Sequence, residues 1–128
     1  MKRNNFILKC LLIVIPIFVE GKTARVLVCE EKIIQKVLLS KDRITTLSFP
    51  VKPTEVAFGR SGFDVKYIGH DLLIRALQTT ETNLFVYLPH RRCVFDLVMT
   101  QANSDELVLI KDPAETKMEI KDVKSTGS

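Results

Sequence analysis

The chain of 128 residues contains no tryptophan, only two histidines and only three cysteines. Without tryptophan, an aromatic face that stacks on bases or sugars is disfavoured. The histidines and cysteines lack the short C-x-x-C and H-x-x-x-H spacings that preorganise zinc sites, so no metal or other cofactor is expected. There is also no Gly-x-Ser-x-Gly motif, no heptad pattern and no internal repeat. These absences remove the usual signatures of a catalytic centre, and we expect a protein that is not an enzyme.

No apolar run reaches the roughly 20 residues that span a bilayer comfortably. Instead, Lys2 and Arg3 precede an uninterrupted apolar run of ten residues, Cys10–Val19. A basic start, a short apolar core and a small residue at Gly21 are typical of a secretory signal peptide. We therefore expect residues 1–21 to be a signal peptide that is cleaved after Gly21, and the protein to be periplasmic.

Two other interpretations of this leader differ in how the chain meets the membrane. Residues 6–19 are interrupted only by Lys9, so an uncleaved leader that anchors the chain in the inner membrane is the alternative. A lipoprotein is disfavoured because Lys9 precedes Cys10 and Val28 precedes Cys29, where a lipidation signal needs a small residue. We expect peripheral or indirect membrane association.

The charge balance bears on the class of partner. The chain has 19 basic and 15 acidic residues, of which three and one respectively lie in residues 1–21. The remaining chain is close to neutral, whereas a nucleic-acid binder needs a strongly basic face to neutralise phosphates. We therefore expect no nucleic-acid partner.

Two cysteines, Cys29 and Cys93, remain beyond residue 21. A periplasmic protein can form disulfides, and both cysteines lie in segments with the pattern of β-strands. If the two strands are neighbours, a bridge would close a long loop and stabilise the fold by about 4 kcal/mol in the chain-entropy model. The alternative is a pair of buried thiols that act as small hydrophobic groups.

From residue 22 onwards, apolar residues recur with a period of two, which indicates β-strands rather than helices. The expected strands cover residues 25–29, 33–39, 44–49, 55–58, 63–67, 72–77 and 107–110, with a hairpin at 83–99. Proline, glycine and polar clusters separate them as turns. The pattern predicts an all-β fold, a small antiparallel β-sandwich over residues 22–110, followed by a disordered charged tail over residues 111–128.

The hairpin is the clearest element of the pattern. Leu84, Val86 and Leu88 share one face, and Phe85 and Tyr87 take the other. Because both faces carry apolar residues, we expect the hairpin to be central and covered on both sides.

The order of pieces between residues 44 and 99 is distinctive. An Ile-Thr-Thr-Leu-Ser-Phe strand is followed by a Val-Ala-Phe-Gly strand end, a Leu-Leu-Ile strand, a Thr-Asn-Leu hairpin entry and a basic turn before an aromatic-containing strand. The positions that match are Thr46, Phe49, Val56, Phe58, Gly59, His70, Leu72, Ile74, Thr82, Asn83, Leu84, Arg91, Arg92 and Phe95.

This order resembles the N-terminal β-domain of the outer-membrane-core subunits of type IV secretion and conjugation machines, the TraK and CagX type. The N-terminal domain of pilus-associated secretins is a close competitor. The resemblance implies a non-enzymatic periplasmic module of a secretion, conjugation or pilus assembly, which contacts other envelope subunits. Family members carry a second β-domain or a pore, and we expect neither here, so a stand-alone accessory, a truncated paralogue and an unrelated β-domain all stay open. The alternative is a free-standing exported β-domain that binds an envelope component, a small ligand or a host protein.

Candidate contact residues cluster at the hairpin. His90, Arg91 and Arg92, the basic turn, are the candidate contacts for an acidic partner or lipid head groups. The alternative is an ordinary solvated hairpin turn, and homo-oligomerisation stays open. Thr82, Asn83 and Leu84 form the structural base of the hairpin, where the Asn83 side chain is expected to satisfy backbone groups and support folding. Among the scattered carboxylates, Asp96 is expected to pair with Arg75 on a neighbouring strand.

Overall fold

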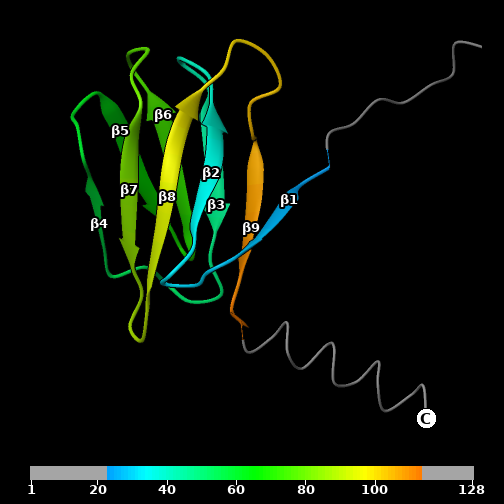
Figure 1. The fold of residues 1–128 in the computed structure, drawn as a ribbon, viewed down its shortest axis with the longest axis vertical. Coiled ribbons are helices and arrows are strands. Elements are labelled where there is room, and N and C mark those ends of the chain that lie inside the picture. The colour runs from blue at the N-terminus through cyan, green and yellow to red at the C-terminus, as the bar shows by residue number, and fades with distance from the viewer. Residues whose placement is uncertain (1–22, 114–128) are drawn as a thin grey trace, which may run out of the picture.

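The computed structural model describes residues 23–113, which form two β-sheets packed face to face (Figure 1). The strands, in chain order, are β1 (Arg25–Val28), β2 (Ile34–Leu39), β3 (Ile44–Ser48), β4 (Glu55–Phe58), β5 (Phe63–Ile68), β6 (Asp71–Ala76), β7 (Thr82–Tyr87), β8 (Arg92–Met99) and β9 (Leu107–Lys111). The predicted all-β sandwich is confirmed. The predicted signal peptide, and the predicted tail from residue 114 onwards, lie outside the described residues.

The two sheets are of mixed, mostly antiparallel pairing. The five-stranded sheet has the order β1-β9-β3-β6-β5, and the four-stranded sheet has the order β2-β8-β7-β4. Among the described strands, β1 pairs with β9, β3 with β9 and β2 with β8 in parallel. These three parallel pairings join segments far apart in sequence, and the local pattern of alternation did not indicate them.

The core lies between the sheets and follows the two-residue period. In β3, Thr45 and Leu47 are fully buried, whereas Ile44 on the outer face is 52% exposed. The inward side chains of the two sheets meet in the middle, where the rings of Phe49 and Phe95 make an edge-to-face contact with centroids 6.4 Å apart. Apolar burial of this kind is the main favourable contribution to the fold.

The β7–β8 hairpin occupies the two central positions of the four-stranded sheet, as expected. Its predicted cover on both faces is wrong. Leu84 and Val86 are buried, but Phe85 is only half-buried and Tyr87 is 36% exposed on the opposite face. The reason is the two-layer architecture, because in residues 23–113 no third layer packs on the outer face of this sheet.

Some boundaries and orientations also differ from the expectation. β9 includes Lys111, one residue beyond the predicted end of the folded domain. Phe63 and Val65 pack against the core as expected, but Tyr67 is 43% exposed although it shares their face, because β5 is an edge strand. Residues 23–113 contain no helix with the length and hydropathy needed to cross a membrane.

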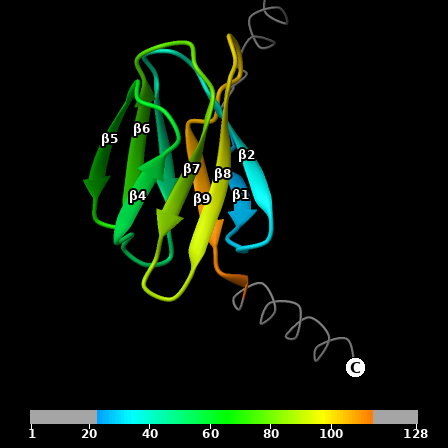
Figure 2. The ribbon, with the colours of Figure 1, turned by 60° about the vertical axis from the view of Figure 1, so that its left-hand side comes forward.

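The sandwich has two unlike sides (Figure 2). On one side lie the edge strands β4 and β5, where the rings of Phe58 and Phe63 stack with centroids 5.2 Å apart. On the other lie the edge strands β1 and β2, where Nη2 of Arg25 donates a hydrogen bond to the Lys36 carbonyl at 2.6 Å. We refer to them as the β4/β5 side and the β1/β2 side.

Candidate interaction surface

The basic turn, His90–Arg92, follows Pro89 at the tip of the β7–β8 hairpin. The turn is closed by a hydrogen bond from the Leu88 N–H to the Arg91 carbonyl at 2.8 Å. Pro89 cannot donate a ladder hydrogen bond, and this favours the reversal of the chain at that point. The turn therefore presents three successive cationic or titratable side chains, but they point to different surroundings.

His90 and Arg91 are held by the end of β9. His90 Nε2 lies 3.1 Å from one carboxylate oxygen of Asp112, and Arg91 Nη2 lies 3.5 Å from the other. Nη1 of Arg91 also donates to the Cys29 carbonyl at 3.2 Å. The half-buried Arg91 thus joins the hairpin tip to the ends of β1 and β9, which is an internal structural role.

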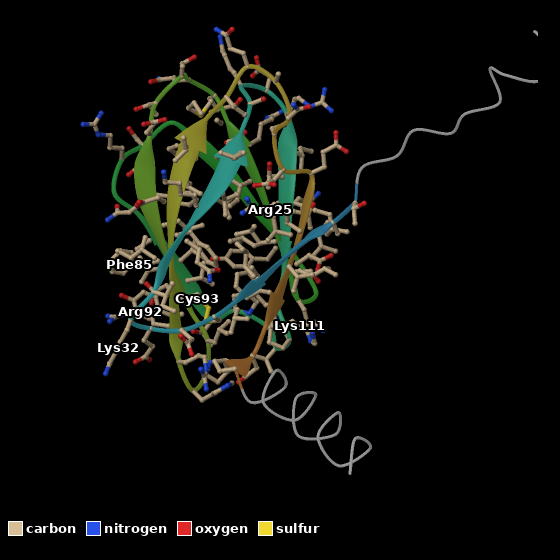
Figure 3. All side chains as sticks on the ribbon, turned by 45° about the vertical axis from the view of Figure 1, so that its right-hand side comes forward. Arg25, Lys32, Phe85, Arg92, Cys93 and Lys111 are labelled. Atoms are coloured by element: carbon tan, nitrogen blue, oxygen red, sulfur yellow. A yellow bond between two sulfur atoms is a disulfide. The ribbon has the colours of Figure 1, made fainter. Side chains whose placement is uncertain are left out.

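Arg92 has a different environment. Its backbone N–H donates to the Glu31 carboxylate at 3.2 Å, while its exposed guanidinium lies over the Phe85 ring, 5.7 Å from the centroid (Figure 3). Such a cation–π contact at an exposed site contributes about 0.5–1 kcal/mol. It also fixes a charged group directly above an apolar ring. Of the three predicted contact residues, Arg92 is the one whose side chain lies on an open sheet face.

An apolar rung crosses the outer face of the four-stranded sheet beneath Arg92. The register places Ile34 beside Val94, Val94 beside Phe85, and Phe85 beside Ala57, one residue from each strand. Ile34 is 60% exposed, and Tyr87 extends the apolar surface next to Phe85. We call Ile34, Val94, Phe85 and Ala57 the apolar rung.

Cys29 and Cys93 form a disulfide with their Cα atoms 5.2 Å apart, which confirms the predicted bridge. The sequence analysis considered a bridge between neighbouring strands, but the two segments lie in different sheets. Cys29 follows β1 of the five-stranded sheet and Cys93 belongs to β8 of the four-stranded sheet, so the disulfide joins the two layers. Both cysteines are buried, and the carbonyl of Cys29 accepts the hydrogen bond from Arg91.

A second tie between the layers was missed by the sequence analysis. The buried carboxylate of Asp105 accepts a hydrogen bond from the Leu38 N–H of β2 at 2.8 Å and lies 3.3 Å from Nε of Arg25 on β1. The Asp105 N–H in turn donates to the Leu38 carbonyl at 2.8 Å. In the sequence, Asp105 is one of several polar residues before a strand, so no local signal distinguished it.

The base of the hairpin lies against the end of β4. The Gly59 N–H donates to the Asn83 carbonyl at 3.1 Å, and a Cβ at position 59 would lie only 2.6 Å from the Thr82 hydroxyl oxygen. The structure therefore brings the Gly59 and Thr82–Leu84 pieces of the sequence pattern together. Within residues 23–113 the exposed Asn83 side chain makes no hydrogen bond to the backbone, so the expected capping role is replaced by packing over Gly59.

The expected ion pair between Asp96 and Arg75 is wrong. Asp96 lies on β8 and Arg75 on β6, in different sheets. Arg75 instead donates to Asp64 on the adjacent β5 at 2.8 Å, and the hydrogen bond and charge of Asp64 raise the pKa of Arg75. The sequence showed two oppositely charged strand residues but not which sheet each belonged to.

Other site chemistry is sparse in the part of the chain that the structure describes. A hollow of about 390 Å³ lies on the outer face of the five-stranded sheet, bordered by Ile44, Asp64, Leu73 and Arg75. Within residues 23–113, no group of three or more His, Cys, Asp or Glu side chains is placed to hold a metal ion. Burial, followed by the nearby charge of Glu55, raises the pKa of Tyr67 above its ordinary 10.0.

No protein-family model matches this chain, and no curated protein matches it. The resemblance to secretion-machine β-domains therefore stays a prediction from the sequence.

Proposed function

We propose that this chain is a non-enzymatic periplasmic module of a secretion, conjugation or pilus assembly, and that it acts through protein–protein contacts. The observation that carries the proposal is the apolar rung with the Arg92 guanidinium fixed above Phe85. A flat apolar strip next to an exposed arginine is typical of protein interfaces, in which aromatic residues and arginine are enriched.

The chemistry of this surface suggests what a partner subunit would present. Apolar side chains would cover Ile34 and Phe85, and a carboxylate would meet Arg92 on the side away from the ring. His90 and Arg91 contribute less, because both are already paired with Asp112.

The alternative is a free-standing exported β-domain that binds a small ligand, an envelope component or a host protein. The hollow beside Ile44 favours it, since about 390 Å³ falls in the size range of small-ligand sites, roughly 300–1,000 Å³. However, the hollow lies on the outer face of a sheet, and its Asp64 and Arg75 side chains are about half exposed. It would bury little of a ligand, so the assembly proposal is preferred.

The test is an affinity pull-down of the tagged full-length chain from detergent-solubilised envelopes, with the intact mass of the bait recorded. We expect secretion or pilus subunits to co-purify, with a bait that begins at Lys22. Ile34→Asp and Arg92→Glu should each reduce their recovery about tenfold, because a single interface residue of this kind contributes about 1–2 kcal/mol.

The matched control is Leu107→Asp, a similarly exposed position on the outer face of the other sheet. It should leave recovery unchanged, and circular dichroism should show that all three variants fold. Recovery of a solitary bait would overturn the assembly proposal and favour the free-standing domain. Equal recovery by all variants would overturn the assignment of the contact to the apolar rung. A bait that retains residues 1–21 would replace the cleaved form by the membrane-anchored one.

A further inference from the structure

Of the four sheet edges, β5 is the one that remains open over a long stretch. β1 and β4 are four residues long, and short edge strands offer few groups to a partner. β2 is six residues long, but the Lys36 carbonyl and both backbone groups of Leu38 are bonded by Arg25 and Asp105. β5 is also six residues long, contains no proline, and pairs with β6 alone (Figure 2).

The register of β5 shows which of its backbone groups are unused. The Leu77 N–H donates to the Gly62 carbonyl at 2.8 Å, which makes these two residues a hydrogen-bonded pair of the β5–β6 ladder. In an antiparallel ladder the bonded pairs alternate, so Asp64, Lys66 and Ile68 also bond towards β6. The N–H and C=O groups of Phe63, Val65 and Tyr67 therefore point away from the sheet.

The side chains of these three residues need further cover. Phe63 and Val65 are half-buried and Tyr67 is 43% exposed, although all three are on the inward face of the sheet. An added strand would supply the missing hydrogen bonds and cover these side chains in one step.

The sequence of β5 is complementary to itself. Val65 is the centre of residues 63–67. Asp64 and Lys66 are its two nearest neighbours, and Phe63 and Tyr67 are the next residues on each side. If a second β5 runs antiparallel with Val65 opposite Val65, then Phe63 faces the second Tyr67 and Asp64 faces the second Lys66. The three pairs made by residues 63, 65 and 67 would each exchange two hydrogen bonds.

We propose that two copies of this chain pair through β5, antiparallel and centred on Val65, so that the two five-stranded sheets become one continuous sheet. The contact is isologous, with each copy giving the same strand. It does not depend on the proposed function, because β5 belongs to the other sheet from the apolar rung.

The charges select this register over its neighbours. A register moved so that position 64 faces 64 would oppose two aspartates, and one in which position 66 faces 66 would oppose two lysines. Like charges directly opposite each other are destabilising, whereas opposite charges stabilise a cross-strand pair. Only the register centred on Val65 joins Asp64 to Lys66 twice. Asp64 already meets Arg75 on its other side, so Lys66 of the second copy would complete a row of alternating charge.

The first test is the oligomeric state of the full-length chain, purified alone, by sedimentation from about 1 µM to about 1 mM, because a single strand pair is smaller than a standard interface. We expect a monomer–dimer equilibrium. Asp64→Lys and Lys66→Asp should each weaken dimerisation by about tenfold, and the double variant should restore it, since both ion pairs are reversed together. Lys36→Asp on β2 is the matched control and should leave the dimer unchanged.

The second test fixes the register with cysteines, in a Cys10→Ser background that removes the one thiol outside the disulfide. An Asp64→Cys chain mixed with a Lys66→Cys chain should give a disulfide-linked dimer on a non-reducing gel. Neither chain alone should do so, because position 64 faces 66 and never itself.

Three results would overturn the proposed β5 dimer, its register or its location. A chain that is monomeric at every concentration overturns the dimer, whether or not envelope partners are recovered in the pull-down. Cross-linking of either cysteine chain with itself overturns the register. A dimer that is insensitive to Asp64→Lys places the contact elsewhere.

Discussion

At the scale of single residues, Asp105 joins segments that are distant in the chain. Its carboxylate accepts from Leu38 and faces Arg25, and its carbonyl accepts from the hydroxyl of the buried Thr45 at 2.5 Å. A buried carboxylate is tolerated only where hydrogen bonds and an opposite charge offset its loss of hydration. Asp105 has both, and it connects β1, β2 and β3.

We expect Asp105→Ala to lower the free energy of unfolding by about 1–3 kcal/mol, because the Leu38 N–H would lose its side-chain acceptor. Asp105→Asn should lower it less, because an amide oxygen can still accept from Leu38. Urea unfolding measures both. Asp71→Ala, a half-exposed carboxylate on β6, serves as the control and should change the value by less than about 0.5 kcal/mol. Equal effects of Asp71→Ala and Asp105→Ala would contradict the role assigned to Asp105.

Tyr67 gives a pH dependence with a defined sign. Burial, and then the charge of Glu55, raise the pKa of its phenol above 10.0 in the folded chain. The folded state therefore holds this proton more tightly than the unfolded state does. The resulting contribution to stability is complete below pH 10.0 and is lost as the pH rises through the folded-state pKa.

The measurement compares the free energy of unfolding of the native chain and of Tyr67→Phe between about pH 9 and about pH 11. All other side chains are the same in the two proteins, so the difference between the two curves isolates Tyr67. We expect the native chain to lose more stability than Tyr67→Phe in the upper part of this range. Superimposable pH profiles would show that folding does not raise the pKa of Tyr67.

At the scale of elements, the disulfide holds the two sheets together where the chain passes from β1 to β2. Cys29 and Cys93 are 64 residues apart in sequence, so reduction releases a long loop in the unfolded chain. We expect the Cys29→Ala, Cys93→Ala double variant to lose about 4 kcal/mol of unfolding free energy. Chemical denaturation measures the loss, and Cys10→Ser is the control without effect. A loss below about 1 kcal/mol would mean that Arg91 and Asp105 hold the layers without the bridge.

The strands themselves could be predicted from the sequence because their signals are local. β4 begins and ends at the predicted residues, since Glu55–Phe58 lies between a proline-containing loop and Gly59. The buried face of β7 followed from Leu84 and Val86 for the same reason, because alternation is a property of neighbouring residues.

Apart from the β7–β8 hairpin, the partners of the strands were not predicted. Nothing local distinguishes β9 beside β1 from β9 beside any other strand. The pairing of Arg75 with Asp64 rather than Asp96 was missed because the strands had not been assigned to sheets. The same limit applies to the candidate surface. The basic turn was visible as three adjacent residues. Its division into a structural Arg91 and an exposed Arg92 depends on Asp112, which follows β9, and on Phe85 of β7.

At the scale of the whole molecule, the two sides of the sandwich differ in the contacts that join the sheets and in how open their edge strands are. The β1/β2 side is joined by the disulfide and by the bonds of Arg25 and Asp105. On the β4/β5 side, the rings of Phe58 and Phe63 stack and Glu55 lies near enough to Tyr67 for its charge to act on it, and the longer edge strand keeps a row of unpaired backbone groups. Natural β-proteins usually shorten, charge or cover such an edge to prevent pairing. An edge left open, with a sequence complementary to itself, favours pairing with a second copy.

Hydrogen exchange of individual backbone amides tests this asymmetry directly. Exchange is slow where an amide is bonded and fast where it faces water, so the amides of Phe63, Val65 and Tyr67 should exchange quickly in dilute solution. At concentrations where the dimer forms, these three amides should become protected. The Leu38 amide, bonded within the chain to Asp105, should be protected at every concentration. Outward amides of β4, such as Val56, should stay fast throughout, because β4 is not part of the proposed contact. Protection of Val56 and Val65 to the same extent would indicate general association rather than pairing through β5, and exchange of Val65 that ignores concentration would contradict the pairing itself.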